Sequence, residues 1–267
     1  MTPPNDPFFA PVSRTPRNTR AGVCDVPILY WDAGMVGLLY RVAPERTRGL
    51  VSEDFEPWVV FGKAIAMFCF FEYRQTSIGP YGEVGLGLLV KRKGSSPSLL
   101  RALADMRKET DCGLHVINLP VTSESACAAG KEIWGYPKYV TPMETSFRPH
   151  GVRFALGREI VMTMGASGKM ATAGLPFVLY SVSDEARILR TVIDVDHRQR
   201  WGGAGTVKIE VTGDGPTART VKALGLDAAA PMLAFRTDGM RSILPAGTDM
   251  GAAISKGAQS VSTSRAA

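Results

Sequence analysis

Short apolar segments recur along the chain between glycines and prolines. Each segment is rich in valine, isoleucine, phenylalanine and tyrosine, which favour the pleated, half-buried surface of a sheet. Strands are therefore expected at residues 36–42, 58–72, 83–90, 114–120, 152–164, 177–182, 188–195 and 206–211.

Helical periodicity is confined to three stretches, residues 98–108, 124–134 and 217–224. The second follows Thr122 and Ser123, either of which can cap a helix, and the third follows a Gly-Pro pair. Long helices do not alternate with the strands, so a doubly wound parallel sheet is not expected. The pattern predicts an α+β fold, mainly antiparallel β, with a barrel-like β core and a few flanking helices.

Both ends of the chain differ in composition from the rest. Five prolines lie within the first 16 residues, and the last 17 residues are small and polar. Such segments bury little apolar surface. We therefore expect a disordered arm at residues 1–22, a single folded domain at 23–250 and a disordered tail at 251–267.

Charge and hydropathy limit the classes of partner that the protein is expected to bind. The formal net charge is +6, but residues 1–22 and 251–267 carry +2 each, so the predicted domain lacks the basic excess that a nucleic-acid surface needs. The N-terminus lacks a secretory signal, and the longest apolar runs, 64–71 and 86–90, are too short to span a membrane. A cytoplasmic protein with neither nucleic acid nor membrane as partner is expected.

The candidate cofactor and metal motifs are weak. Residues 82–87 (GEVGLG) have glycines at strand spacing, and no helix follows them as a dinucleotide loop requires. Asp194, Asp196 and His197 fit the exposed face of a strand better than a set of metal ligands. The four cysteines show no CxxC spacing and are expected to be reduced and buried. We expect neither a metal nor a cofactor.

The segment KEIWGYPKY at residues 131–139 has an unusual local constraint. The predicted helix ends near Trp134, Gly135 permits a left-handed exit, and Pro137 forces Tyr136 into an extended conformation. Lys138 is therefore held on a stiff turn between aromatic residues. Residue types alone favour an exposed loop lysine at this position.

Two segments carry a resemblance to a known family. GPYGE at 79–83 and EIWGYPK at 132–138 resemble the Gly-x-Tyr-x-Glu and Glu-x-x-x-Tyr-Pro-Lys elements of the acetoacetate decarboxylase family. Tyr40-Arg41, residues 162–165 and residues 215–217 extend the resemblance over about residues 25–245. It implies the fold of that family and a homo-oligomer.

The resemblance also implies site residues. Lys138 would form a Schiff base with a small keto acid substrate, and Glu83 would orient or protonate groups around the imine. The amine attacks only when it is neutral, and aromatic neighbours disfavour its charged form by excluding water. The expected substrate-binding residues are Phe68, Tyr81, Trp134, Tyr136 and Tyr139.

Three positions depart from the pattern of the true decarboxylases. Tyr139 replaces a second lysine, Phe68 replaces a second glutamate in an ungapped alignment, and residues 25–35 hold no arginine for a substrate carboxylate. These departures argue against acetoacetate itself as substrate. Candidate replacements for the missing arginine are Arg74, Arg153 and Arg158.

The sequence leaves two functions open. The favoured hypothesis is a Schiff-base-forming lyase that acts on a keto acid, by decarboxylation of a β-keto acid or by aldol or dehydration chemistry through the same enamine. The alternative is a non-catalytic small-molecule-binding or oligomeric scaffold protein with the same fold.

Overall fold

The structure is a computed structural model that describes residues 6–254. Three α-helices are present in this part of the chain, α1 (Leu99–Ala104), α2 (Glu124–Trp134) and α3 (Pro216–Leu224), together with two short 3-10 turns, η1 (Pro44–Thr47) and η2 (Ala204–Thr206). The strands are β1 (Thr15–Thr19), β2 (Gly22–Val26), β3 (Ile28–Val42), β4 (Phe55–Pro57), β5 (Ala64–Thr76), β6 (Tyr81–Arg92), β7 (Cys112–Val121), β8 (Lys138–Val140), β9 (Met143–Arg148), β10 (Gly151–Leu156), β11 (Ile160–Met164), β12 (Ala171–Ala173), β13 (Phe177–Val182), β14 (Arg187–Asp196), β15 (Arg198–Gly202), β16 (Val207–Val211), β17 (Leu233–Leu244) and β18 (Thr248–Ala252).

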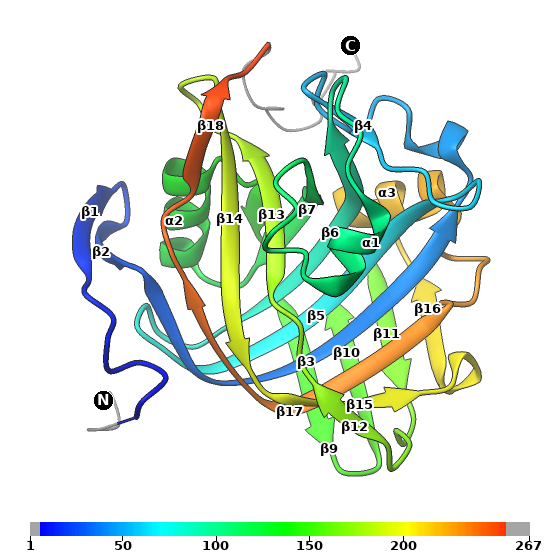
Figure 1. Ribbon diagram of the computed structural model, residues 1–267. Helices are drawn as coiled ribbons and strands as arrows, with labels where there is room; N and C mark the ends of the chain where they lie inside the picture. The colour runs from blue at the N-terminus through cyan, green and yellow to red at the C-terminus, as the bar shows by residue number, and fades with distance from the viewer. Residues whose placement is uncertain (1–5, 255–267) are drawn as a thin grey trace, which may run out of the picture.

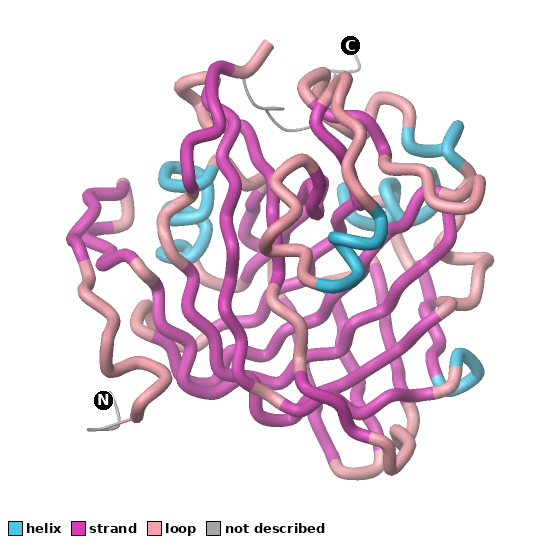
Figure 2. The backbone as a smooth tube through the Cα atoms, in the orientation of Figure 1, coloured by secondary structure: helices cyan, strands magenta, loops and turns pink. Residues whose placement is uncertain are grey.

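A closed barrel forms the centre of the molecule (Figures 1 and 2). Its seven strands follow the order β17, β3, β5, β6, β7, β13 and β14, and β14 pairs with β17 to close the ring. The pairs around the ring are antiparallel, apart from β7 with β13. The predicted fold class, mainly antiparallel with a barrel-like core, is confirmed.

A second sheet, in the order β16, β11, β10 and β9, packs on the outside of the barrel wall. Because side chains alternate along a strand, β5 serves two cores. Phe68 and Phe70 join the outer core, where the Phe70 ring lies 5.5 Å from that of Phe154 on β10. Cys69 and Phe71 join the inner core inside the barrel.

The three predicted helices form, and the ends of two of them, α1 and α3, differ from the prediction. Helix α2 has its predicted bounds, because the Ser123 hydroxyl accepts a hydrogen bond from the backbone N–H of Ala126 and Gly135 ends it at φ +67°. Helix α1 stops at Ala104, where Asp105 is extended. None of the helices in the described part is long and apolar enough to cross a membrane.

The prediction of a disordered arm is wrong for residues 6–22. β1 pairs with β2 as a hairpin, the Phe9 side chain is buried, and Asp6 pairs with Arg241. The hairpin also reaches α2, since the backbone N–H of Arg20 donates to Glu132. These contacts with distant elements bury surface that the segment cannot bury by itself, and they explain why it is ordered. Residues 1–5 and most of the predicted tail, 255–267, lie outside the described residues.

β17 is a barrel strand that the hydrophobic pattern does not predict. Polar residues and a glycine interrupt its apolar positions between Arg236 and Gly239, where its pairing with β3 is irregular. The long predicted strand at 152–164 is instead the hairpin of β10 and β11, which turns at Gly157 with φ +48°. Local periodicity does not detect either feature.

Candidate active site

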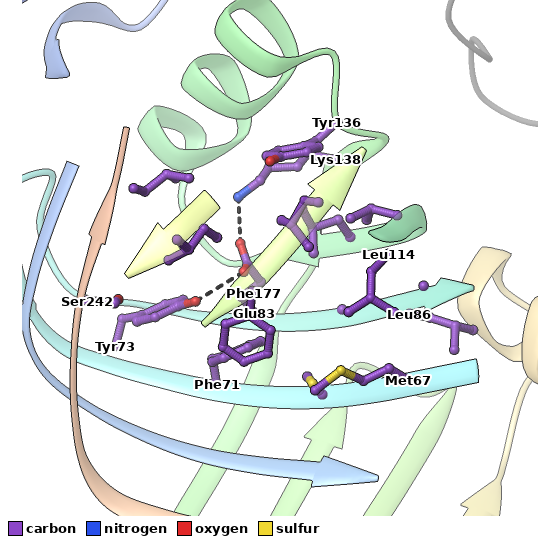
Figure 3. Close-up of a pocket in the computed structure, with 18 of the residues that line it drawn as sticks. Met67, Phe71, Tyr73, Glu83, Leu86, Leu114, Tyr136, Lys138, Phe177 and Ser242 are labelled. Atoms are coloured by element: carbon purple, nitrogen blue, oxygen red, sulfur yellow. Dashed lines mark hydrogen bonds and ion pairs between the residues drawn. The ribbon is translucent and has the colours of Figure 1, made fainter. Parts of the chain in front are cut away.

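The inside of the barrel holds a cavity of about 100 Å³. Its lining comes from inward-facing residues of β3, β5, β6, β7, β13, β14 and β17, closed at one end by the segment after α2 (Figure 3). The lining is Tyr30, Met67, Cys69, Phe71, Tyr73, Glu83, Gly85, Leu86, Gly87, Leu114, Val116, Leu119, Tyr136, Lys138, Phe177, Leu179, Ile193, Met240, Ser242 and Leu244. The cavity is mostly apolar and holds one acid and one base.

Lys138 points into this cavity from the first position of β8. β8 pairs in parallel with β7, with Lys138 opposite Leu119, which fixes the lysine in an inward register. Its side chain is only 7% exposed, so the exposed loop position that residue types alone favour is not what the structure shows. Gly130 makes room for the lysine, since a Cβ there would lie 2.4 Å from Lys138 Cδ and Cε.

Glu83 faces Lys138 from β6. Lys138 Nζ lies 2.5 Å from Glu83 Oε2, and both side chains are buried. The Tyr73 hydroxyl donates to the other carboxylate oxygen, Oε1, at 3.3 Å. Lys138 Nζ also lies 5.7 Å from the centre of the Tyr81 ring. Each oxygen of Glu83 therefore has a donor, and the ammonium has a carboxylate and an aromatic face.

The tyrosines under Glu83 stay protonated. Burial, and after it the charge of Glu83, raise the pKa of Tyr73 and of Tyr30 well above the usual value for tyrosine. The Tyr30 and Tyr81 hydroxyls lie 3.0 Å apart. Tyr73 consequently acts as a fixed hydrogen-bond donor to Glu83 rather than as a base.

The aromatic residues around Lys138 form two layers. Tyr136 lies in the cavity wall. Trp134 is fully buried behind it, with the two rings stacked 6.2 Å apart, and its Nε1–H donates to the Pro245 carbonyl. Trp134 supports the wall from outside the cavity and does not line it, whereas the resemblance implies contact with substrate.

A family model for acetoacetate decarboxylase (ADC) matches residues 9–158, more than half of the chain. The chain belongs to the acetoacetate decarboxylase family. Among solved structures it is similar to an acetoacetate decarboxylase at 18% identity, over 86% of this chain and 91% of that one, with a TM-score of 0.66. No curated protein sequence matches it.

Two further structures share the fold. The acetoacetate decarboxylase of Legionella pneumophila matches at 16% identity over 92% of this chain and 94% of its own, with a TM-score of 0.63. The enduracididine biosynthesis enzyme MppR, solved in complex with pyruvate, matches at 15% identity over 93% and 96%, with a TM-score of 0.56. The resemblance predicted from the two motifs is confirmed at the level of family and fold.

Phe68, Tyr81 and Tyr139 do not line the cavity, so the structure does not support their prediction as substrate-binding residues. Phe68 is fully buried in the outer core, because it has the opposite strand parity to Cys69 and Phe71. Tyr139 follows Lys138 on β8 and faces the other way, with its hydroxyl 2.7 Å from Thr217 Oγ1. The ungapped alignment therefore places the second family glutamate on the wrong face of β5.

None of the three candidate arginines reaches the cavity. Arg74 binds Asp32 and Glu72, Arg153 pairs with Glu144, and Arg158 is exposed after β10. Lys138 is the single cation in the described lining. The arginine and second glutamate that the decarboxylase pattern calls for have no counterpart among these lining residues.

Most residues of the cavity lining are not among the predicted site residues. The inward residues of β5 (Met67, Cys69 and Phe71) alternate with the predicted Phe68, so strand parity is a usable signal for them. Phe177 and Ser242 belong to β13 and β17, which reach the site only through barrel closure. No local pattern points to these two residues.

Proposed function

We propose that this protein is a Schiff-base-forming lyase that acts on a keto acid through Lys138. The observation that carries the proposal is the buried 2.5 Å contact between Lys138 Nζ and Glu83 Oε2 at one end of an apolar cavity. Membership in the acetoacetate decarboxylase family supports this chemistry, and the pyruvate complex of the similar MppR supports a keto acid as ligand.

The first step is activation of the amine. An ammonium and a carboxylate in an apolar cavity both lose hydration, so transfer of a proton from Nζ to Oε2 leaves two neutral groups that are cheaper to bury. The amine then attacks the carbonyl carbon and forms the C–N bond. Glu83 returns its proton to the carbinolamine hydroxyl, water leaves, and the product is an iminium ion on Lys138.

The second step uses the iminium as an electron sink. A β-keto acid releases CO2, and the electron pair of the broken C–C bond moves toward the iminium nitrogen. Alternatively, the Glu83 carboxylate removes a proton from the carbon next to the iminium. Both routes give an enamine, which takes a proton or adds to a second carbonyl. Tyr73 keeps Oε1 occupied, so Oε2 is the oxygen that exchanges protons.

Acetoacetate itself does not fit the proposal well. The described lining offers its carboxylate no arginine, and the family's second glutamate is absent from the inward positions Met67, Cys69, Phe71 and Tyr73 of β5. We therefore favour another keto acid, or aldol and dehydration chemistry. The cytoplasmic location and the homo-oligomer stay predictions.

Reductive trapping tests the proposal. Borohydride added with pyruvate or acetoacetate should attach the reduced substrate to the chain, with the added mass mapped to Lys138 by peptide analysis. The variant Lys138→Met, which keeps the aliphatic stem, should give no adduct, and the control Lys131→Met on α2 should react like the wild type. A wild type that forms no adduct with any keto acid would sink the proposal and favour a non-catalytic binding protein.

A further inference from the structure

The glycines at 82–87, which do not form a dinucleotide loop, make one wall of the cavity. On β6 the positions that share the face of Glu83 are Gly85 and Gly87, and both line the cavity. They lie opposite Cys69 and Met67 of β5. A Cβ would come 3.2 Å from Leu119 Cδ1 at Gly85 and 3.1 Å from the His115 carbonyl oxygen at Gly87. Neither position has room for a side chain, so this wall is a strip of bare backbone that leads away from Glu83.

The two sides of the cavity differ in polarity (Figure 3). The Tyr73 and Ser242 side chains lie on one side of Glu83, and the buried Tyr136 hydroxyl has no hydrogen-bond partner among the described residues. On the other side lie apolar residues, among them Met67 and Leu114. One part of a ligand therefore meets hydroxyl groups and an amine, and the rest meets hydrocarbon.

The charges of the cavity are balanced before a substrate enters. Lys138 and Glu83 are the only charged residues in the described lining, and they pair with each other. One substrate carboxylate can face the iminium and the hydroxyl groups. A second charge, on the part of the substrate that lies over Gly85 and Gly87, would be buried without a partner.

We infer that the substrate is a keto acid whose other carbonyl substituent is a short, uncharged aliphatic chain that lies over Gly85 and Gly87. This inference rests on the proposed Schiff-base function. The cavity of about 100 Å³ is small and also has to hold the keto acid group, so the aliphatic chain that fits beside that group is short.

A series of 2-oxo acids tests the inference on the wild-type protein. The concentration that gives half-maximal trapping by cyanoborohydride should fall about fourfold per methylene from pyruvate to 2-oxobutanoate to 2-oxopentanoate. 2-Oxoglutarate has a carboxylate in place of the terminal methyl of 2-oxopentanoate and should bind less well than pyruvate. Equal affinities across the series, or a preference for 2-oxoglutarate, would overturn the inference. If no acid is trapped, the proposed function itself fails.

A pair of glycine variants tests where the aliphatic chain of the substrate lies. Gly85→Ala places a methyl group in the strip against Leu119 and Phe71, and should reduce the preference for 2-oxopentanoate over pyruvate from about sixteenfold toward one. Gly239→Ala, where a Cβ meets open space, should keep the wild-type preference. An unchanged preference in Gly85→Ala would refute the placement. If Gly85→Ala does not fold, the series on the wild type still decides whether the chain is apolar.

Discussion

Gly130→Ala is expected to slow imine formation at Lys138 while changing the stability of the protein only slightly. Gly130 lies inside α2, and the aliphatic stem of Lys138 crosses the helix at this glycine. An added Cβ would lie 2.4 Å from Lys138 Cδ and Cε, whereas ordinary contacts begin at 3.4 Å. The stem of the lysine must therefore retreat by about 1 Å, and Nζ moves with it relative to Glu83.

The two consequences have opposite signs. Replacing a glycine inside a helix by alanine stabilises the helix by about 1 kcal/mol, which compensates part of the strain at Lys138. A misplacement of about 1 Å at a reacting group costs on the order of a hundredfold in rate. We therefore expect the rate of imine trapping with pyruvate to fall by about two orders of magnitude, while the melting temperature moves by less than about 5 °C.

The assay is the rate of borohydride-trapped adduct formation, measured by intact mass, beside a thermal melt of the same preparation. Gly203→Ala is the matched control, because a Cβ at Gly203 meets no atom within 4 Å. Trapping by Gly130→Ala at the wild-type rate would show that the packing of the Lys138 stem against α2 does not control the reactivity of the amine. A large loss of stability would show that the lysine cannot move aside.

Four further outcomes follow from buried groups. Lys138→Met leaves Glu83 buried without its counter-charge, so urea unfolding should show a loss of about 3–5 kcal/mol. Most of this loss should return in the double variant with Glu83→Gln. Phe9→Ala removes a buried anchor of the N-terminal segment and should cost about 2 kcal/mol in the same assay, in contrast to a disordered arm, which would show no change. Tyr139→Lys should leave CO2 release from acetoacetate unchanged, because the side chain faces away from the cavity; strong release would contradict that orientation. Burial lowers the pKa of His115 to about 4. Between about pH 6.5 and 4 this histidine is therefore protonated in the unfolded chain and neutral in the folded chain. Stability should therefore fall by up to about 3 kcal/mol between pH 6.5 and 4, and His115→Gln should flatten this dependence; equal slopes for both proteins would contradict it.

Local sequence determined the parts of this protein whose conformation is set within a few residues. Gly135 ends α2 with a positive φ, and the turn that delivers Lys138 follows from it and from Pro137. Apolar residues at strand spacing gave seven of the eight predicted strands a counterpart in the same place, and the remaining one, at 152–164, is a hairpin. These features depend on backbone sterics and side-chain periodicity, both of which are visible along the chain.

The tertiary structure decided what lies around the lysine. Glu83 is 55 residues away from Lys138 in sequence, and the 2.5 Å contact exists because the registers of β6, β7 and β8 turn both side chains inward. On β5, Phe68 faces the outer core and the next residue, Cys69, faces the cavity. A shift of one residue in the alignment therefore places a site residue on the opposite face of the strand. Barrel closure adds β17, a strand that the hydrophobic pattern does not predict because polar residues interrupt it. The order of residues 6–22 likewise depends on contacts that the chain makes only after α2 and β17 are in place, because a short hairpin cannot bury enough surface to be stable alone.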